Sequence, residues 1–338
     1  MTAQTRNRTA VLASLGVLLL LLSSGVLYWQ AVGVVADPGN PHANFWRVVR
    51  EGLPAYTSTP SQGHTILIVN GGENWREIRN GLLMPYSQWL LAVAVVAVGL
   101  FYLFVGGEKL EKPRSGIMIE RYSLAERVLH WYTAALFIAM AITGLGILLG
   151  RLLLMPILGH PFVSGYLGAC KILHNYSGPL LVAGFLLELI AWVRYNIPKK
   201  SDLLWFKNMG GMLGRKGGPR PHVEKINGGQ KAWFWLVIVF GAIVGCTGIV
   251  LDFPIWDQTR LTMQVSHVIH ATVAVLFVAA SFGHIYMGTL GSEGAFDGIW
   301  KGSVDAVWAE QHSDLWYEAK MQERAGKTSS TSAEGAMP

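Results

Sequence analysis

One stretch of the chain, residues 264–290, limits the possible folds more than any other. It is apolar and long enough to cross a bilayer as a helix, yet it contains His267, His270 and His284. Lipid offers no partners to backbone polar groups, so such a segment must be helical. Ionisable side chains inside a membrane are costly and usually serve a function. We therefore predict a membrane helix whose histidines have a task.

The three histidines of this helix differ in the direction they face. His270 and His284 lie 14 positions apart, so at about 100° per residue they fall within roughly 40° of each other. At about 1.5 Å per residue this spacing separates them by roughly 21 Å, close to the thickness of the hydrocarbon layer. His267 lies about 100° from the face of His284 and is interpreted as a bystander. One helix therefore offers one imidazole near each membrane surface.

The overall composition agrees with an integral membrane protein. Of the 338 residues, 51% are hydrophobic and only 14% are charged. The net charge of +6 also suits a nucleic-acid partner, but the Lys and Arg residues gather in residues 108–127 and 194–231. Such basic loops mark the cytoplasmic side of a membrane protein. We therefore predict a multi-pass membrane protein, in contact with lipid and with no nucleic-acid partner.

The apolar segments predict an all-α integral membrane protein built on a four-helix transmembrane bundle, with one or two extra N-terminal transmembrane helices. Residues 1–36 suit both a retained helix and a cleaved signal peptide. A charge-poor loop is expected at residues 150–169, between the first two helices of the bundle. The expected parts are 1–36, a transmembrane helix or signal peptide; 37–85, a periplasmic segment; 86–107, a transmembrane helix; 108–291, the four-helix domain; and 292–338, a cytoplasmic tail.

Histidines in other predicted spans complete a pattern of two levels. His130 begins a span that enters from the cytoplasmic side, where His284 ends one, and His174 and His270 each begin a span on the opposite side. Two facing imidazoles without a carboxylate or thiol ligand suit a six-coordinate b-type haem inside a four-helix bundle. A single membrane histidine is usually a hydrogen-bonded packing group, but four at two matched depths are harder to explain in that way. The sequence therefore predicts two haems b, one held by His130 and His284 on the cytoplasmic side and one by His174 and His270 on the periplasmic side.

The two cysteines, Cys170 and Cys246, exclude other redox sites. No CxxC motif is present, which argues against an iron–sulfur cluster or zinc site held by this chain, and without CxxCH there is no covalent c-type haem. We interpret both residues as free thiols within or beside apolar segments.

A glycine-rich segment on the predicted cytoplasmic side is a candidate quinone site. Asn227, Gly229 and Gln230 precede a membrane span. They supply an amide and open backbone donors to a quinone carbonyl near His284, and the alternative is a structural role at the start of the helix. Ubiquinone and menaquinone fit equally well.

Arginines and glycines in the spans have two interpretations each. Arg121, Arg127 and Arg194 are possible partners of haem propionates, although each also fits a solvated charge that sets the topology. Glycines at near-helical spacing either allow close helix packing or make room for a macrocycle. They are Gly144, Gly146 and Gly150 in one span and Gly241, Gly245 and Gly248 in another.

Four ordered motifs carry a resemblance to a known family. RVLHW around His130, KILHNYSG around His174, KINGGQK at residues 225–231 and VIHATVAVLFVAASFGHIYM at residues 268–287 resemble the gamma subunit of respiratory formate dehydrogenase, a di-haem cytochrome b. The likeness covers about residues 115–320. The chain resembles more distantly the cytochrome b subunits of nickel–iron hydrogenases and thiosulfate reductases.

The resemblance implies an electron-transfer subunit with no formate-oxidising site of its own. It implies electrons arriving from an iron–sulfur beta subunit, a periplasmic catalytic alpha subunit with a molybdenum or tungsten pterin cofactor, and quinone as the acceptor at the cytoplasmic side. The histidine pairs and the quinone site of the family fall on the residues named above. Short members of the family begin near the counterpart of Tyr122, so the preceding residues of this chain put subunit stoichiometry and docking in doubt.

Two alternatives stay open. A nickel–iron hydrogenase or a related quinone-reducing oxidoreductase has a cytochrome b subunit of the same kind, and the co-purifying catalytic subunit distinguishes them. A non-haem anchor or transporter, with histidines that relay protons or brace helices, is the third hypothesis. It predicts broken helices or paired repeats, which the sequence lacks.

Overall fold

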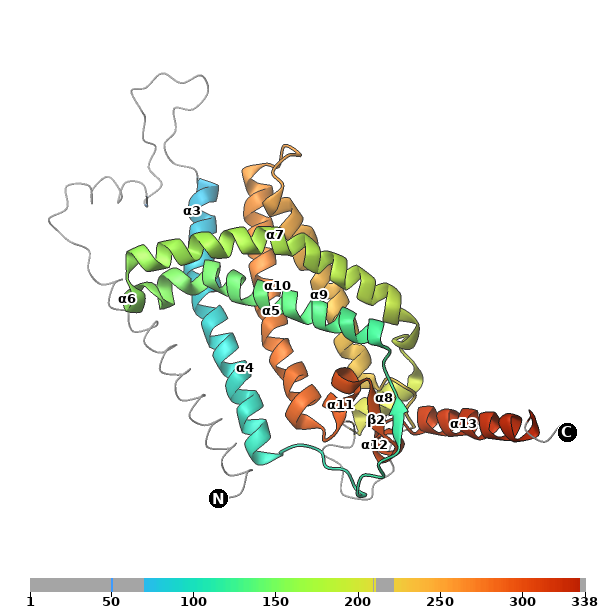
Figure 1. Ribbon diagram of the computed structural model, residues 1–338. Coiled ribbons are helices and arrows are strands. Elements are labelled where there is room, and N and C mark those ends of the chain that lie inside the picture. The colour runs from blue at the N-terminus through green and yellow to red at the C-terminus, as the bar shows by residue number, and fades with distance from the viewer. Residues whose placement is uncertain (1–49, 51–69, 209, 211–221, 335–338) are drawn as a thin grey trace, which may run out of the picture. The chain divides into compact units, whose positions relative to one another are not determined.

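Five long helices dominate the computed structural model, which describes residues 50, 70–208, 210 and 222–334. All five are long and apolar enough to cross a membrane. The chain is thus an all-α, multi-pass membrane protein, as predicted. The predicted first span, in residues 1–36, lies outside the described residues. The five helices are α4 (Met84–Phe104), α5 (Leu124–Leu153), α7 (His160–Trp192), α9 (Gly228–Asp252) and α10 (Arg260–Tyr286) (Figure 1).

The helix that contains α4 begins earlier than the apolar pattern indicates. Helix α3 (Asn70–Glu77) and a π-helical stretch, η1 (Ile78–Leu83), run directly into α4. The π-helical stretch ends just before Pro85, which lacks an N–H group for an α-helical hydrogen bond. The whole stretch suitable for crossing a membrane is Asn74–Phe104, so the helix includes residues that we expected outside the membrane.

The loop predicted at residues 150–169 is wrong, because this segment is almost entirely helical. Helix α5 extends to Leu153, a short helix α6 (Met155–Leu158) follows, and α7 begins at His160. Gly159 separates α6 from α7 with a φ of 76°, a conformation that glycine adopts without strain. Pro161 lies in the first turn of α7, where a missing N–H group removes no helical hydrogen bond.

The chain divides into two compact units, and each long helix contributes a segment to both. The first unit comprises residues 1–96, 140–176 and 243–279, and the second comprises residues 97–139, 177–242 and 280–338. The histidines divide in the same way. His174, His267 and His270 belong to the first unit, whereas His130 and His284 belong to the second.

Glycines allow close helix packing within the first unit. A Cβ added to Gly146 would lie 3.1 Å from the Cys170 sulfur, and one added to Gly150 would lie 2.9 Å from a methyl group of Leu167. Helices α5 and α7 therefore approach each other through small residues, as membrane helices commonly do. Cys170 is buried at this contact and is a free thiol, as is the exposed Cys246.

Glycines also allow close helix packing in the second unit. A Cβ on Gly184 of α7 would meet the Thr133 hydroxyl of α5 at 2.9 Å. A Cβ on Gly241 of α9 would meet the Phe185 ring of α7 at 2.6 Å. For Gly146, Gly150 and Gly241, the packing interpretation therefore describes the observed contacts.

The predicted tail folds against the start of the four-helix region in the second unit. Strand β1 (Met118–Glu120) pairs antiparallel with β2 (Ser303–Asp305), with Ile119 opposite Val304. Ile119, Val304 and Trp308 are buried in a small apolar core. Residues of α11 (Ala295–Lys301), α12 (Ala306–His312) and α13 (Asp314–Glu334) belong to this core or pack against it, and η4 (Met287–Gly291) precedes α11. The remaining elements are η2 (Val193–Tyr195) and α8 (Lys200–Lys207), between α7 and α9.

Candidate functional site

The first unit brings two of the predicted histidines face to face. The rings of His174 on α7 and His270 on α10 have centres 6.1 Å apart and planes inclined by 77°. The Nδ1 atom of His174 lies 2.9 Å from the Thr143 hydroxyl, and that of His270 lies 3.1 Å from the Thr247 hydroxyl. The partners at Nδ1 leave Nε2 of each ring as the available ligand atom.

Two glycines let the neighbouring helices approach these rings. A Cβ on Gly144 of α5 would lie 3.0 Å from Cε1 of His174, and a Cβ on Gly248 of α9 would lie 3.2 Å from Cε1 of His270. Each glycine directly follows the threonine that contacts the same ring. Gly144 and Gly248 therefore make room at the histidines, unlike Gly146, Gly150 and Gly241.

The second unit holds the other predicted pair. The rings of His130 on α5 and His284 on α10 have centres 6.4 Å apart and planes inclined by 50°. His284 stacks on Trp233 of α9 at 4.4 Å and 7°, and Trp131 meets His130 edge-on at 5.2 Å. Nδ1 of His130 is buried and has no hydrogen-bond partner among the described residues. This pair is held mainly by aromatic contacts.

Both ring separations fit a single metal ion between two imidazoles. A metal bonded to one nitrogen of each ring at about 2 Å holds the ring centres roughly 6 Å apart. Across the described part of the chain, no cluster of three or more His, Cys, Asp or Glu residues offers a metal site. Two imidazoles with four other positions left to a macrocycle form the ligand set of a six-coordinate haem.

His267 lies outside both facing pairs. Its ring contacts Trp75 of α3 in the first unit, with centres 5.4 Å apart and planes inclined by 68°. The contact links α10 to the helix that precedes α4. His267 therefore has a packing partner of its own, which the sequence alone did not reveal.

The predicted quinone residues form the start of α9. Asn227 Oδ1 accepts a hydrogen bond from the Gln230 backbone N–H at 2.8 Å, and Gln230 Oε1 accepts one from the Asn227 backbone N–H at 3.1 Å. This reciprocal arrangement is a capping box. Gly229 packs against Trp205, where a Cβ would meet the ring at 2.6 Å. The side-chain NH2 of Asn227 makes no hydrogen bond to any residue in the described ranges, so it is available to a ligand.

The three predicted propionate partners have different surroundings. Arg121 is buried, donates to the Lys225 carbonyl at 2.6 Å and lies over the rings of Tyr122, Trp308 and Trp316. Arg127 donates to the Trp300 carbonyl at 2.7 Å, while its Nε is buried without a hydrogen-bond partner in the described segments. Arg194 is exposed and lies over the Tyr195 ring. Arg127 alone of the three has a buried donor that its protein contacts leave unused.

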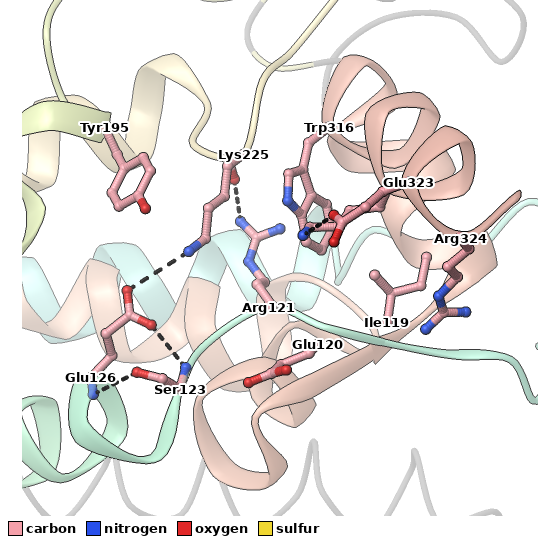
Figure 2. Close-up of a pocket in the computed structure, with 11 residues that line it drawn as sticks. Ile119, Glu120, Arg121, Ser123, Glu126, Tyr195, Lys225, Trp316, Glu323 and Arg324 are labelled. Carbon is pink, nitrogen blue, oxygen red and sulfur yellow. Dashed lines mark hydrogen bonds and ion pairs between the residues drawn. The ribbon is translucent and has the colours of Figure 1, made fainter. Parts of the chain in front are cut away.

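A pocket of about 520 Å³ in the second unit lies beside these basic residues. Figure 2 shows Glu126 at its edge, where the carboxylate accepts a hydrogen bond from the Ser123 backbone N–H at 2.8 Å and lies 3.7 Å from the Lys225 ammonium group. Opposite charges pair within the lining, so the pocket selects no single sign of ligand charge. Its lining residues are Ile119, Glu120, Arg121, Ser123, Glu126, Tyr195, Lys225, Trp316, Lys320, Glu323 and Arg324.

The part of the chain that contains the paired histidines matches a family of known proteins. A family model described as prokaryotic cytochrome b561 matches residues 121–302, more than half of the chain, and the match contains all four paired histidines. The chain belongs to this family. A prokaryotic cytochrome b561 carries haem b, and the two imidazole pairs, together with the glycines against the His174 and His270 rings, fit that group.

Curated relatives match most of their own length. The formate dehydrogenase cytochrome b556(fdo) subunit of Escherichia coli K12 is 28% identical over 202 residues, which is 59% of this chain and 92% of the relative. The nitrate-inducible cytochrome b556(Fdn) subunit of the same organism is 28% identical over 215 residues, 63% of this chain and 96% of the relative. The formate dehydrogenase cytochrome b556 subunit of Haemophilus influenzae is 26% identical over 231 residues, 63% and 92% respectively.

Three contacts at the histidines were missed by sequence reasoning. Thr143 and Thr247 each precede a glycine in a membrane span, and this repeated Thr-Gly pair is the only sequence signal that could point to them. Trp233 lies four residues after Gly229, on the same face of α9, and this spacing is the sequence feature that could have suggested its role. Neither signal tells which histidine is contacted, because that depends on the rotation of each helix.

Proposed function

We propose that the chain is the membrane cytochrome b subunit of a formate dehydrogenase, passing electrons from a periplasmic iron–sulfur subunit through two haems b to quinone on the cytoplasmic side. The two facing histidine pairs support this proposal most, since each presents the ligand set of one haem. The relatives, which carry the name of a formate dehydrogenase subunit, supply the nature of the complex. A haem b with two axial imidazoles supplies one-electron transfer when bound.

The residues of this chain hold the two redox centres in fixed places. His174 and His270 would bind one haem, and His130 and His284 would bind the other. His270 and His284 both belong to α10 and are 14 positions apart on it, which corresponds to roughly 21 Å along its axis.

The distribution of charge supports the proposed orientation. The basic stretches 108–127 and 194–231 both belong to the second unit, together with His130 and His284. Basic segments remain on the cytoplasmic side of a membrane. The His130 and His284 pair is therefore assigned to the cytoplasmic level, and His174 and His270 to the periplasmic level. Of the predicted periplasmic segment 37–85, residues 37–49 and 51–69 lie outside the described part of the chain.

The proposed quinone site adjoins His284 through the first turns of α9. Asn227 offers its unused NH2 group, and Gly229 and Gln230 belong to the same turn. One turn later, Trp233 stacks on His284. A quinone carbonyl that accepts a hydrogen bond from Asn227 would thus lie at the start of α9. The next turn of this helix carries Trp233, which supports the proposed haem ligand His284. Nearby, Arg127 precedes His130 by three residues and offers its buried Nε to a haem propionate.

The partners follow from the same proposal. An iron–sulfur beta subunit would deliver electrons, and a catalytic alpha subunit with a molybdenum or tungsten pterin cofactor would oxidise formate. The chain itself would contribute electron transfer and a quinone site in the inner membrane. A nickel–iron hydrogenase is the competing assembly, because a membrane cytochrome b of this kind suits it equally well.

Purification of the intact complex in mild detergent tests the proposal. We expect two haems b per chain, measured from reduced absorbance against protein concentration, and a formate-oxidising subunit that co-purifies. A ratio well below two, or no b-type spectrum, would exclude the di-haem assignment. A co-purifying nickel–iron subunit would instead assign the chain to a hydrogenase. Unaltered spectra after alanine replacement of all four paired histidines would favour a non-haem anchor.

A further inference from the structure

A repeated motif contacts both histidines of the first unit. Thr143 and Gly144 on α5 face His174, and Thr247 and Gly248 on α9 face His270. In each case the threonine hydroxyl lies within 3.1 Å of the ring Nδ1, and the following glycine lies against Cε1. Two different helices therefore present the same Thr-Gly arrangement to two different imidazoles.

The hydrogen bonds determine which ring nitrogen of His270 carries the proton. The Thr247 hydroxyl donates to the Ile243 carbonyl at 2.6 Å, so its oxygen is left to accept from the ring. The Val244 carbonyl also lies 3.0 Å from Nδ1 of His270, and a carbonyl can only accept. Nδ1 of His270 must therefore carry the hydrogen, which leaves Nε2 with its lone pair free.

His174 has a matching environment. The Thr143 hydroxyl donates to the Met140 carbonyl at 3.3 Å and lies 2.9 Å from Nδ1 of the ring. Met140 precedes Thr143 by three residues, as Val244 precedes Thr247. The same chemistry therefore assigns the hydrogen of His174 to Nδ1.

The other histidine pair differs at His130. Nδ1 of His130 has no hydrogen-bond partner within the described ranges, and His284 is supported by stacking on Trp233. An acceptor on the outer N–H of a metal-bound imidazole raises the basicity of the ligating nitrogen and fixes the ring orientation. A more basic ligand stabilises the oxidised iron, so the reduction potential falls.

We infer that Thr143 and Thr247 are positioning residues that hold His174 and His270 with the proton on Nδ1 and thereby give their haem a lower potential than the haem of His130 and His284. This inference rests on the proposed function, since it concerns the haems assigned there. Electrons entering at the periplasmic level then move downhill in energy towards the cytoplasmic level. The two threonines contribute to the direction of electron flow without touching iron or substrate.

Redox titration of the intact complex tests the inference. Thr143→Val and Thr247→Val remove the threonine hydroxyl at nearly constant volume, whereas Thr143→Ser and Thr247→Ser retain a hydroxyl. In Thr247→Val the Val244 carbonyl still accepts from Nδ1 of His270, so this ring loses one of its two acceptors. Loss of such a partner lowers metal affinity about tenfold, and a tenfold loss that falls on the oxidised iron alone corresponds to about 59 mV for one electron. We expect Thr143→Val to raise the potential of one haem by about this amount. Thr247→Val should raise the potential of the same haem by less, because the Val244 carbonyl still accepts from His270. Each serine variant should match the wild type.

A matched control separates this effect from a general loss of a threonine. The Thr289 hydroxyl bonds to the Ile285 carbonyl at 2.6 Å, four residues earlier on its own helix, as that of Thr247 bonds to Ile243. Thr289→Val should leave both potentials unchanged. Two haems with unmoved potentials in both valine variants would overturn the inference, as would equal shifts of both haems or serine variants that behave like valine.

The wild-type complex provides a second test if a valine variant loses haem. His174→Ala and His130→Ala, each lacking one ligand, assign the two wild-type midpoints to their haems. The haem lost in His174→Ala should have the lower midpoint, and the opposite order would overturn the inference. An absence of any b-type haem in the wild-type complex is a different result, because it would contradict the proposed function itself.

Discussion

Replacement of Gly144 by alanine tests how closely α5 approaches a haem ligand. The new Cβ would lie 3.0 Å from Cε1 of His174, whereas ordinary van der Waals contact begins at 3.4 Å. The ring or the helix must therefore yield by about 0.4 Å, the difference between these distances. At Gly248 the corresponding distance is 3.2 Å, so the required movement at His270 is about half as large.

The free energies predict a graded loss of haem binding. Inserting a methyl group into a packed site costs about 1–3 kcal/mol. The higher helix propensity of alanine, about 1 kcal/mol over glycine, stabilises the helix with and without haem and does not change haem affinity. We expect a loss of at least about 1 kcal/mol in haem binding for Gly144→Ala, roughly fivefold in haem affinity, and a smaller loss for Gly248→Ala. The affected group is an axial ligand, so the cost falls on haem binding.

The assay compares haem retention in the purified complex during dilution and mild denaturation. Gly168→Ala on α7 is the control, because no atom lies within 4 Å of a Cβ at that position. Gly144→Ala should release one haem earlier than the wild type, Gly248→Ala slightly earlier, and Gly168→Ala at the same point. Equal retention in Gly144→Ala and Gly168→Ala would refute the packing argument.

Three further predictions concern side chains near the sites and at the surface. His267→Ala should keep both haem spectra while His270→Ala loses one, since only His270 belongs to a facing pair; difference spectra that show the reverse contradict the facing argument. Asn227→Asp should keep the cap of α9 but weaken binding of a quinone analogue, because aspartate accepts the cap hydrogen bond and lacks the amide donor; unchanged analogue affinity would remove Asn227 from the site. A hydrogen bond from His222 to the Asp314 carboxylate at 2.5 Å, together with its charge, raises the pKa of His222. This contact therefore stabilises the fold fully below the unfolded pKa of about 6.5 and less as the pH rises through the higher folded pKa. Hydrogen exchange around His222, corrected for its intrinsic pH dependence, should be less protected at high pH, and Asp314→Asn should abolish the difference.

Much of the candidate site could be predicted from helical periodicity. A long membrane helix has one regular geometry, so the sequence spacing of two residues gives their relative direction and their separation. On α10 the spacing of His270 and His284 fixes both their shared face and their separation. The charge of the loops then gave the orientation of each membrane span and so the depth of each histidine. His174 was therefore expected beside His270, and His130 beside His284. The structure brings together these same rings. Haem binding at the two pairs stays a prediction.

The side-chain contacts between helices could not be predicted from the sequence, for a physical reason. The rotation of α5 and α9 about their axes decides whether Thr143 and Thr247 meet a ring, and apolar side chains cover these helices on all sides. Hydrophobic periodicity therefore gives no inward face. The strand pairing of Ile119 with Val304 was missed because each strand has three residues, too few for an alternating pattern to be recognised.

The β1–β2 ladder also sets an order on the synthesis of the chain. Strand β1 ends at Glu120 and β2 begins at Ser303, so four membrane helices are made between them. At about 5–20 residues per second, a ribosome needs roughly ten to forty seconds for that stretch. Ile119 has no strand partner during this time. The ladder therefore closes only after the last of these four membrane helices has been made, so its formation marks a membrane bundle whose synthesis is complete.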